Sequence, residues 1–188
     1  MNTEQQMTDY LQGLTLPEKL LPLIRFDRHA AGNDFFSQGF EFRIDNDKAG
    51  LKTYSEDPAF LDSLYEFATA DGTGSGYCFW LKDGNTNLEQ APVVVFGSEG
   101  GHHVVAHNFD ELMQLLTFDS EAMIDWDEVC YYKDPDDFEP SAESDTYHHW
   151  LQCHFGISVI DDADAIVASA QATHQQAFRE WVARFYQD

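Results

Sequence analysis

At 188 residues the chain has the length of one domain and is long enough to bury a hydrophobic core. Hydrophobic residues make up 43% of the sequence and aromatic residues 14%, a composition that excludes an intrinsically disordered chain. Thirty-four acidic residues against ten basic residues give a formal net charge of −24. Such a charge disfavours nucleic acid, anionic membrane surfaces and polyanionic substrates, and it attracts basic partners.

The compartment is predicted from three features. No apolar run approaches the roughly 20 residues that cross a bilayer, and the N-terminal segment lacks the basic and apolar regions of a secretory signal. Cys78, Cys130 and Cys153 are odd in number and form no C-x-x-C pair, so we expect reduced cysteines, with Cys78 in the core. These features predict a cytoplasmic protein.

The first elements in chain order are two short helices and a hairpin. Apolar residues recur at helical spacing over 7–14, and a second helical stretch follows over 17–24. Residues 40–44 alternate between apolar and polar, as a half-buried strand does. After a turn at 45–50, residues 51–54 are predicted to form the return strand.

A helix and an antiparallel meander are predicted next. Asp57 and Pro58 have the character of an N-cap and a first helical residue, and an apolar face continues at helical spacing to Ala68. The glycine-rich segment 71–76 is predicted to end this helix. Three apolar segments joined by short connections then predict an antiparallel sheet. They cover residues 77–81, 93–96 and 102–106.

Three further helices are predicted in the second half of the chain. Asn108 can cap a helix over 109–116, with Glu111 completing a capping box. A short helix over 147–155 ends at Gly156, and a long amphipathic helix runs over 163–185. We find no repeat and no linker, so residues 1–188 are predicted to form a single α+β domain, its largely antiparallel sheet flanked by helices.

An acidic loop region or insertion that contains several aromatic residues is predicted between the first two of these helices. Residues 119–145 contain eleven acidic residues and one base, Lys133. Acids steer a basic partner and large aromatic side chains anchor it, whereas the same aromatics can instead pack onto the domain beneath a solvated loop. Both interpretations are open at this stage. The candidate partner-binding residues are Asp125, Trp126, Asp127, Glu128, Tyr131, Tyr132, Asp134, Asp136, Asp137 and Glu139.

Two motifs suggest small-ligand sites. The glycines of 71–76 suggest a phosphate-binding loop, but that loop needs a strand before it and a helix after it. The predicted order is the reverse, so we expect a tight helix-to-strand turn. Asp45, Asp47, Gly50 and Glu56 match calcium-loop positions, yet Ala49 offers no side-chain oxygen and a strand is predicted before the loop, so a hairpin turn is favoured.

Metal and catalytic signatures are weak. His103 and His107 share strand parity, and Cys153 lies among the histidines of 148–154, but no H-x-x-x-H or C-x-x-C spacing is present. The chain has no G-x-S-x-G elbow. With 34 acidic residues, a carboxylate pair carries no information. We therefore expect no metal site, no cofactor and no enzymatic activity.

A family resemblance lies between Phe67 and Leu116. The segments that carry it are Phe67-Ala68-Thr69-Ala70-Asp71-Gly72, Gly76-Tyr77-Cys78-Phe79-Trp80-Leu81, Ala91-Pro92-Val93-Val94-Val95-Phe96 and Val104-Val105-Ala106-His107-Asn108-Phe109-Asp110-Glu111-Leu112, with Leu16-Pro17-Glu18 before them. This pattern resembles the SUKH superfamily of bacterial immunity proteins and related eukaryotic cell-wall regulators. The resemblance implies a mixed sheet flanked by helices and a non-enzymatic role in binding toxin domains, often nucleases.

The leading hypothesis is therefore an immunity-type protein that neutralises a protein toxin, plausibly a basic nuclease. The partner would be that toxin or another basic protein, and neither nucleic acid nor a membrane. One alternative is a regulatory protein-interaction domain without a toxin partner. A second alternative, from another class, is a small metal-dependent hydrolase that uses undetected carboxylates or a His/Cys site.

Overall fold

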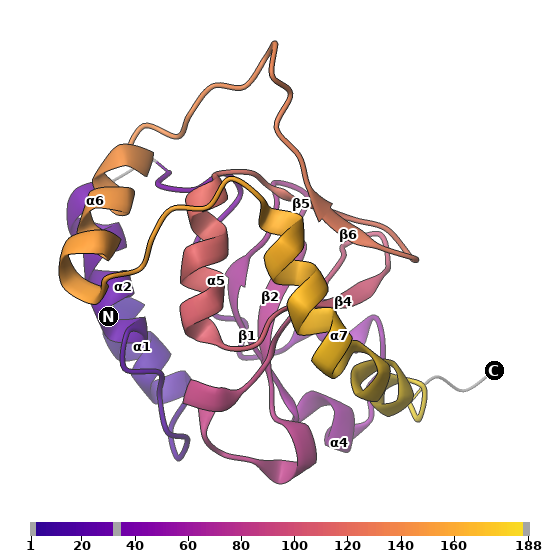
Figure 1. Cartoon of the computed structure of the whole chain (residues 1–188). Coiled ribbons are helices and arrows are strands. Elements are labelled where there is room, and N and C mark those ends of the chain that lie inside the picture. The colour runs from indigo at the N-terminus through magenta and orange to yellow at the C-terminus, as the bar shows by residue number, and fades with distance from the viewer. Residues whose placement is uncertain (1–2, 32–34, 186–188) are drawn as a thin grey trace.

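The computed structural model describes residues 3–31 and 35–185, and it has an α+β fold (Figure 1). Its main sheet is an antiparallel meander in the order β1-β2-β3-β4, as predicted for the last three strands. The strands are β1 (Leu64–Thr69), β2 (Gly76–Trp80), β3 (Val93–Phe96) and β4 (His102–Ala106). Every residue of β2 and β3 is buried, because helices and loops cover both faces of the sheet.

The helices surround this sheet. The α-helices are α1 (Thr3–Tyr10), α2 (Leu20–Phe26), α3 (Ala49–Lys52), α4 (Pro58–Leu61), α5 (Phe109–Leu115), α6 (Ser144–Phe155) and α7 (Ala163–Val182). A π-helical turn extends α2 over Asp27–Ala31, and 3₁₀ turns cover Lys82–Gly84, Leu88–Gln90 and Leu116–Phe118. The predicted caps are confirmed: the Asn108 side chain accepts from the Glu111 N–H, and Gly156 ends α6 in the left-handed conformation.

Two hydrophobic clusters lie on opposite faces of the sheet. The larger contains stacked Phe67 and Phe79 with Phe109 of α5, and it joins α1, α2 and α6 to that face. The smaller is built on Trp80 and Phe178, and it contains residues of α3, α4 and the C-terminal part of α7. Cys78 is fully buried in this smaller cluster, as predicted.

Helix α7 runs along the free edge of β4 and contacts both clusters. Its Gln175 Oε1 accepts a hydrogen bond from the Val104 N–H at 2.7 Å, and Gln171 Nε2 donates to the Val104 carbonyl at 3.2 Å. These side chains occupy edge groups of β4 that could otherwise pair with another strand. In Figure 1, α7 crosses the front of the fold beside β4.

The predicted helix over 57–68 is wrong beyond its first turn. Asp57 does cap a helix, accepting from the Ala59 N–H at 2.8 Å, but only Pro58–Leu61 is helical and β1 follows. Strand β1 is covered on both faces, so its apolar run is nearly continuous and does not alternate. A bulge between Glu66 and Ala68 further obscures the strand pattern.

The predicted hairpin over 40–54 is also wrong. Residues 49–52 form α3, because the Asp45 carboxylate accepts the N–H groups of Asp47 and Ala49 and starts a helical turn. Segment 40–44 pairs with β1 only through a single bridge, Phe42 with Ala68, and the flanking backbone hydrogen bonds. This irregular segment nevertheless covers the outer edge of β1.

His102 is the first residue of β4, and its side chain packs against α7 in a largely apolar environment. Its ring stacks on Phe96 and meets Phe178 edge-on. Burial, with smaller contributions from His103 and Arg179, lowers the pKa of His102 to about 4. In the unfolded chain the imidazole titrates at about 6.5.

The free energy of unfolding is therefore expected to fall as the pH is lowered from about 6.5 to about 4, because the unfolded state takes up a proton that the folded state does not. Asp27 acts in the opposite direction, since burial and then Glu41 raise its pKa to about 6. The His102→Phe variant tests this assignment. Its free energy of unfolding, measured by urea denaturation, should depend less steeply on pH than that of the wild-type chain. An unchanged slope in the variant would contradict this assignment.

Candidate functional site

A second, two-stranded sheet forms the core of the candidate site. Strands β5 (Ala122–Ile124) and β6 (Val129–Tyr131) pair antiparallel, with Ala122 opposite Tyr131 and Met123 opposite Cys130. Side chains alternate across a strand, so Ala122, Val129 and Tyr131 are buried whereas Met123 is 55% exposed. One face of the hairpin is therefore open to solvent, at the end of the molecule that also carries the acidic loop over 132–143 (Figure 1).

The hairpin is held firmly against the main domain. The Ala122 N–H donates to the Ala70 carbonyl at 3.0 Å. At the hairpin tip, His103 Nε2 lies 2.7 Å from the Asp125 carbonyl, and an Arg179 nitrogen donates to the Asp127 carbonyl at 3.4 Å. The open face is thus presented by a supported element.

Most of the predicted partner-binding residues are exposed. Trp126 is 67% exposed and Tyr132 is 60% exposed. The exposed acidic residues of the predicted set are Asp125, Asp127, Glu128, Asp134, Asp136, Asp137 and Glu139. These acidic residues form two groups, one at the hairpin tip (125–128) and one in the acidic loop (134–139). Tyr132 lies at the start of that loop, directly after β6.

Tyr131 is a correction to the predicted set. Only 5% of this residue is exposed, and its hydroxyl lies 2.8 Å from that of Tyr77 in the core. Burial raises the pKa of both phenols well above the usual range, so the two hydroxyls form a neutral hydrogen bond. Tyr131 therefore anchors the hairpin, and its buried side chain offers little surface to a partner.

Replacing Tyr131 with phenylalanine should lower the free energy of unfolding by about 1–2 kcal/mol, because the Tyr77 hydroxyl is left buried without this partner. Chemical denaturation measures the change. Tyr132→Phe is the matched control and should alter stability by less than about 0.5 kcal/mol, since Tyr132 is exposed. Equal effects at the two positions would contradict the assignment.

The acidic loop is tied down by a buried carboxylate. Asp119 is 2% exposed and accepts from the Gln38 N–H at 2.9 Å, the Ser141 N–H at 2.8 Å and the Ser141 hydroxyl at 2.6 Å. Lys133, the base of this region, lies over the rings of Phe118 and Phe138 at 4.6 and 4.3 Å. Of the aromatic residues in this region, Phe138 and Tyr131 thus pack onto the rest of the chain, whereas Trp126 and Tyr132 are exposed.

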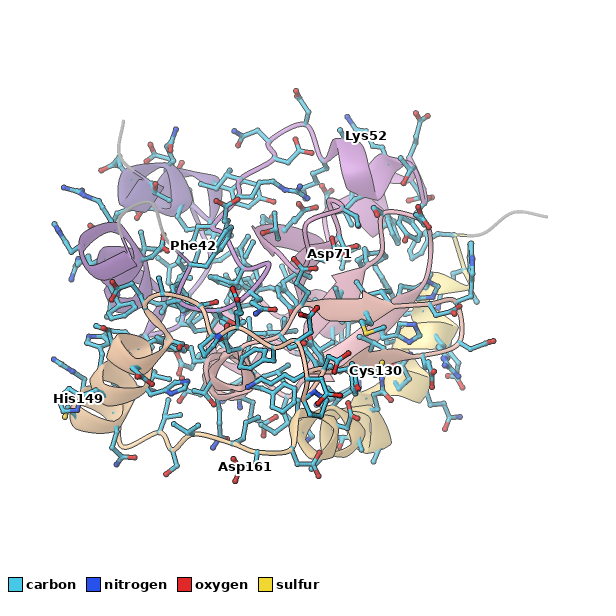
Figure 2. All side chains as sticks on the ribbon, turned by 90° about the horizontal axis from the view of Figure 1, so that it is seen from above. Phe42, Lys52, Asp71, Cys130, His149 and Asp161 are labelled. Carbon is cyan, nitrogen blue, oxygen red and sulfur yellow. The ribbon has the colours of Figure 1, made fainter. Side chains whose placement is uncertain are left out.

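A groove runs beside the hairpin across the ends of the main strands. It consists of three depressions of about 480, 260 and 240 Å³, which share lining residues from one to the next. The first lies between Phe35 and Glu121, the second between Glu121 and Glu99, and the third between Glu99 and Trp126. Figure 2, viewed from above, shows Asp71 beside the hairpin that carries Cys130, with His149 at the opposite end of the molecule.

The groove is acidic. Its described lining includes the carboxylates of Glu41, Asp71, Glu99 and Glu121, and Arg43 is the one cation among those lining residues. Arg43 is already engaged, because its guanidinium pairs with the buried Glu66 carboxylate. The groove therefore presents negative charge without a free positive counterpart, which favours a basic ligand.

The exposed large apolar side chains gather at this end. Of those in the described part of the chain, Phe35, Met123, Trp126 and Tyr132 lie along the groove or hairpin, and Val159 lies elsewhere. We define the hairpin surface as the exposed side chains of Phe35, Glu99, Glu121, Met123, Asp125, Trp126, Asp127, Glu128 and Tyr132. Phe35 and Glu99 were not among the predicted partner-binding residues, because they come from distant turns that only the tertiary structure brings to the groove.

The chain was compared with known protein families, curated proteins and solved structures. The chain matches no protein-family model, no curated protein and no solved structure.

The glycine-rich segment 71–76 is a hairpin turn between β1 and β2, so the helix predicted before it is absent. The Asp71 carboxylate accepts from the N–H groups of Thr73, Gly74 and Ser75 at 2.8–3.0 Å. Burial alone would raise the pKa of Asp71, but its hydrogen bonds with Ser75 and Thr73 lower it. The N–H groups that a phosphate would need are thus occupied by the chain's own carboxylate.

The candidate metal ligands have other roles. Asp45 caps the start of α3, as described above, and His107 Nε2 lies 3.2 Å from the Ser169 hydroxyl. His149 and Cys153 face one another at 3.5 Å on the exposed side of α6. Among residues 3–31 and 35–185, no group of three or more His, Cys, Asp or Glu side chains could hold a metal ion. Within the same ranges, no helix has both the length and the apolar character needed to cross a membrane.

Proposed function

We propose that this chain binds a basic protein through the hairpin surface, as an immunity-type protein that neutralises a toxin. The observation that carries the proposal is one rigidly supported surface on which exposed apolar side chains alternate with carboxylates. Monomeric proteins seldom expose several large apolar side chains together without a binding role. Here three of them, Phe35, Met123 and Trp126, line a groove whose one described cation is already paired.

The apolar side chains and the carboxylates of the hairpin surface contribute to binding in different ways. Trp126, Tyr132 and Met123 supply apolar area that a partner can desolvate, and aromatic anchors of this kind provide much of the affinity at protein interfaces. The surrounding carboxylates increase the association rate for a basic protein. The net charge of −24 extends this attraction beyond the contact itself.

The resemblance to the SUKH superfamily gives the proposal its specific form. The resembling segments lie in β1 to β4, which form the sheet that supports the hairpin, and in α5. Toxin nucleases have basic clefts that hold nucleic-acid phosphates, and an acidic surface inserted there would compete with the substrate. The complex would form in the cytoplasm, the compartment predicted from the sequence.

Co-expression with the product of the adjacent reading frame tests the proposal. We expect the two proteins to purify as a complex, and we expect this chain to relieve growth arrest caused by the neighbour alone. Trp126→Ala combined with Met123→Ala should weaken capture, whereas Val159→Ala, at an exposed position away from the hairpin, should not. Growth arrest that this chain fails to relieve would contradict neutralisation, and complex formation without any arrest would favour the regulatory alternative.

A further inference from the structure

A small pocket lies between the hairpin tip and the β3–β4 turn. It has a volume of about 240 Å³, and Trp126, Tyr54, Glu99 and the backbone of Gly97–Gly100 line it. This volume suits one long side chain better than a metabolite, because small-molecule pockets usually enclose about 300–1,000 Å³. The pocket is therefore of the size that a partner's anchor residue fills.

The indole of Trp126 is fixed in place without being covered. Gly100 has a φ of +112°, and a Cβ there would lie 2.3 Å from Trp126 Cζ2. Only glycine allows the ring to approach the turn this closely. Since 67% of Trp126 remains exposed, the turn supports the ring and leaves most of its surface open.

Tyr54 is a second aromatic residue in the lining of the pocket. Its hydroxyl lies 2.5 Å from the Gly97 carbonyl oxygen and 3.0 Å from that of Gly101, and its ring packs edge-on against Phe96. These contacts connect Tyr54 to the same turn that supports Trp126. The two aromatic walls are thus pre-organised, which reduces the entropy lost when a side chain enters.

The charge around the pocket is negative. The Glu99 carboxylate is exposed at its rim, and Asp127 and Glu128 are exposed at the neighbouring hairpin tip. Arg179, the base that reaches this tip, donates to the Asp127 carbonyl. An aromatic face beside a carboxylate attracts a cation.

We propose that this pocket binds an arginine side chain of the basic partner, an inference that rests on the proposed function and specifies its anchor. A planar guanidinium stacks on an indole and at the same time donates to a carboxylate. An ammonium group offers no such plane and is more strongly hydrated. Arginine and tryptophan are also the residue types enriched at interface hot spots.

Nuclear magnetic resonance on the full chain tests the pocket with a defined probe. The peptide acetyl-Gly-Arg-Gly-amide should produce a saturable shift of the Trp126 indole N–H and the Gly100 amide. The citrulline analogue has the same shape without the charge and should bind about tenfold more weakly, as expected if cation–π attraction contributes over 1 kcal/mol. The lysine peptide should bind more weakly than the arginine peptide. Equal affinity for the arginine and citrulline peptides would overturn the proposal.

Three variants test whether the peptide binds in the pocket or is attracted only by the general negative charge of the chain. Trp126→Leu should abolish the Gly100 shift, and Glu99→Gln should weaken binding about threefold. Val159→Ala shortens an exposed apolar side chain outside both the pocket and the hairpin surface, and it should leave the affinity for the peptide unchanged. A Gly100 response that persists in Trp126→Leu, or equal losses in all three variants, would count against the pocket.

The experiments distinguish a failure of the arginine pocket from a failure of the proposed function. If the neighbouring protein is captured but the arginine peptide binds no better than the citrulline peptide, the arginine pocket is wrong and the proposed function stands. If the arginine peptide binds selectively but no protein partner is captured, the pocket stands and the proposed function is wrong.

Discussion

Replacing Arg43 with methionine is expected to lower the free energy of unfolding by about 3 kcal/mol. Its partner Glu66 is 4% exposed, and the Arg43 guanidinium donates to the Glu66 carboxylate and, at 3.2 Å, to the Gly74 carbonyl. Removing the cation leaves a carboxylate buried without its counter-charge. The expected cost is at the low end of the range for buried pairs because the Arg43 side chain is 38% exposed.

A double variant provides the control. Adding Glu66→Gln to Arg43→Met removes the uncompensated charge, so most of the lost stability should return. Burial raises the pKa of Glu66 while Arg43 lowers it, so the pKa should rise further when Arg43 is absent. The loss in Arg43→Met should therefore shrink as the pH falls through that raised pKa. A loss below about 1 kcal/mol at pH 7, or no recovery in the double variant, would contradict this account.

The ion pair also shapes the groove. It connects segment 40–44 to the turn between β1 and β2, and both line the first depression. A Cβ at Gly76 would lie 2.7 Å from the Glu66 Cδ, so glycine is required where the turn passes over the carboxylate. Stability and partner binding should therefore both decrease when this pair is broken.

Charge reversal at the hairpin is expected to slow association with the basic partner about 10- to 100-fold at low ionic strength. The variant Glu121→Lys/Asp127→Lys/Glu128→Lys changes three exposed residues of the hairpin surface. Stopped-flow or surface-based kinetics measures the association rate. The difference from wild type should shrink as salt is added, since exposed charges are screened.

The acidic loop supplies a matched comparison. Asp136→Lys/Asp137→Lys/Glu139→Lys alters the net charge equally at exposed positions outside the described lining of the groove. This variant should slow association less than the hairpin variant, because long-range steering is reduced while the contact is retained. A larger effect from the loop variant would place the contact on the loop.

The sequence predicted the elements whose signals are local. Continuous apolar runs marked β2 and β3, a side-chain cap at Asn108 marked the start of α5, and an apolar face at helical spacing marked α7. It misassigned β1 because a strand buried on both faces and interrupted by a bulge resembles one face of a helix. It predicted a strand over 51–54, where α3 is observed instead. The start of α3 depends on the hydrogen bond from the Ala49 N–H to the Asp45 carboxylate, which an apolar pattern does not reveal.

The candidate site was only partly predictable for a related reason. Composition alone directed attention to Trp126 and Tyr132, and both are exposed. Tyr131 could not be separated from Tyr132 until the β5–β6 pairing fixed which residues face inward. Phe35 and Glu99 come from distant turns, and only the tertiary structure brings them to the groove.

Hydrogen exchange of the complex with the neighbouring gene product tests the central claim most directly. We expect binding to increase amide protection over 121–132, 97–101 and 35–43, the segments that form the hairpin surface and groove. Helix α6, at the opposite end of the molecule in Figure 2, should keep its exchange rates. New protection confined to α6 or to the acidic loop, with the hairpin unchanged, would contradict the account.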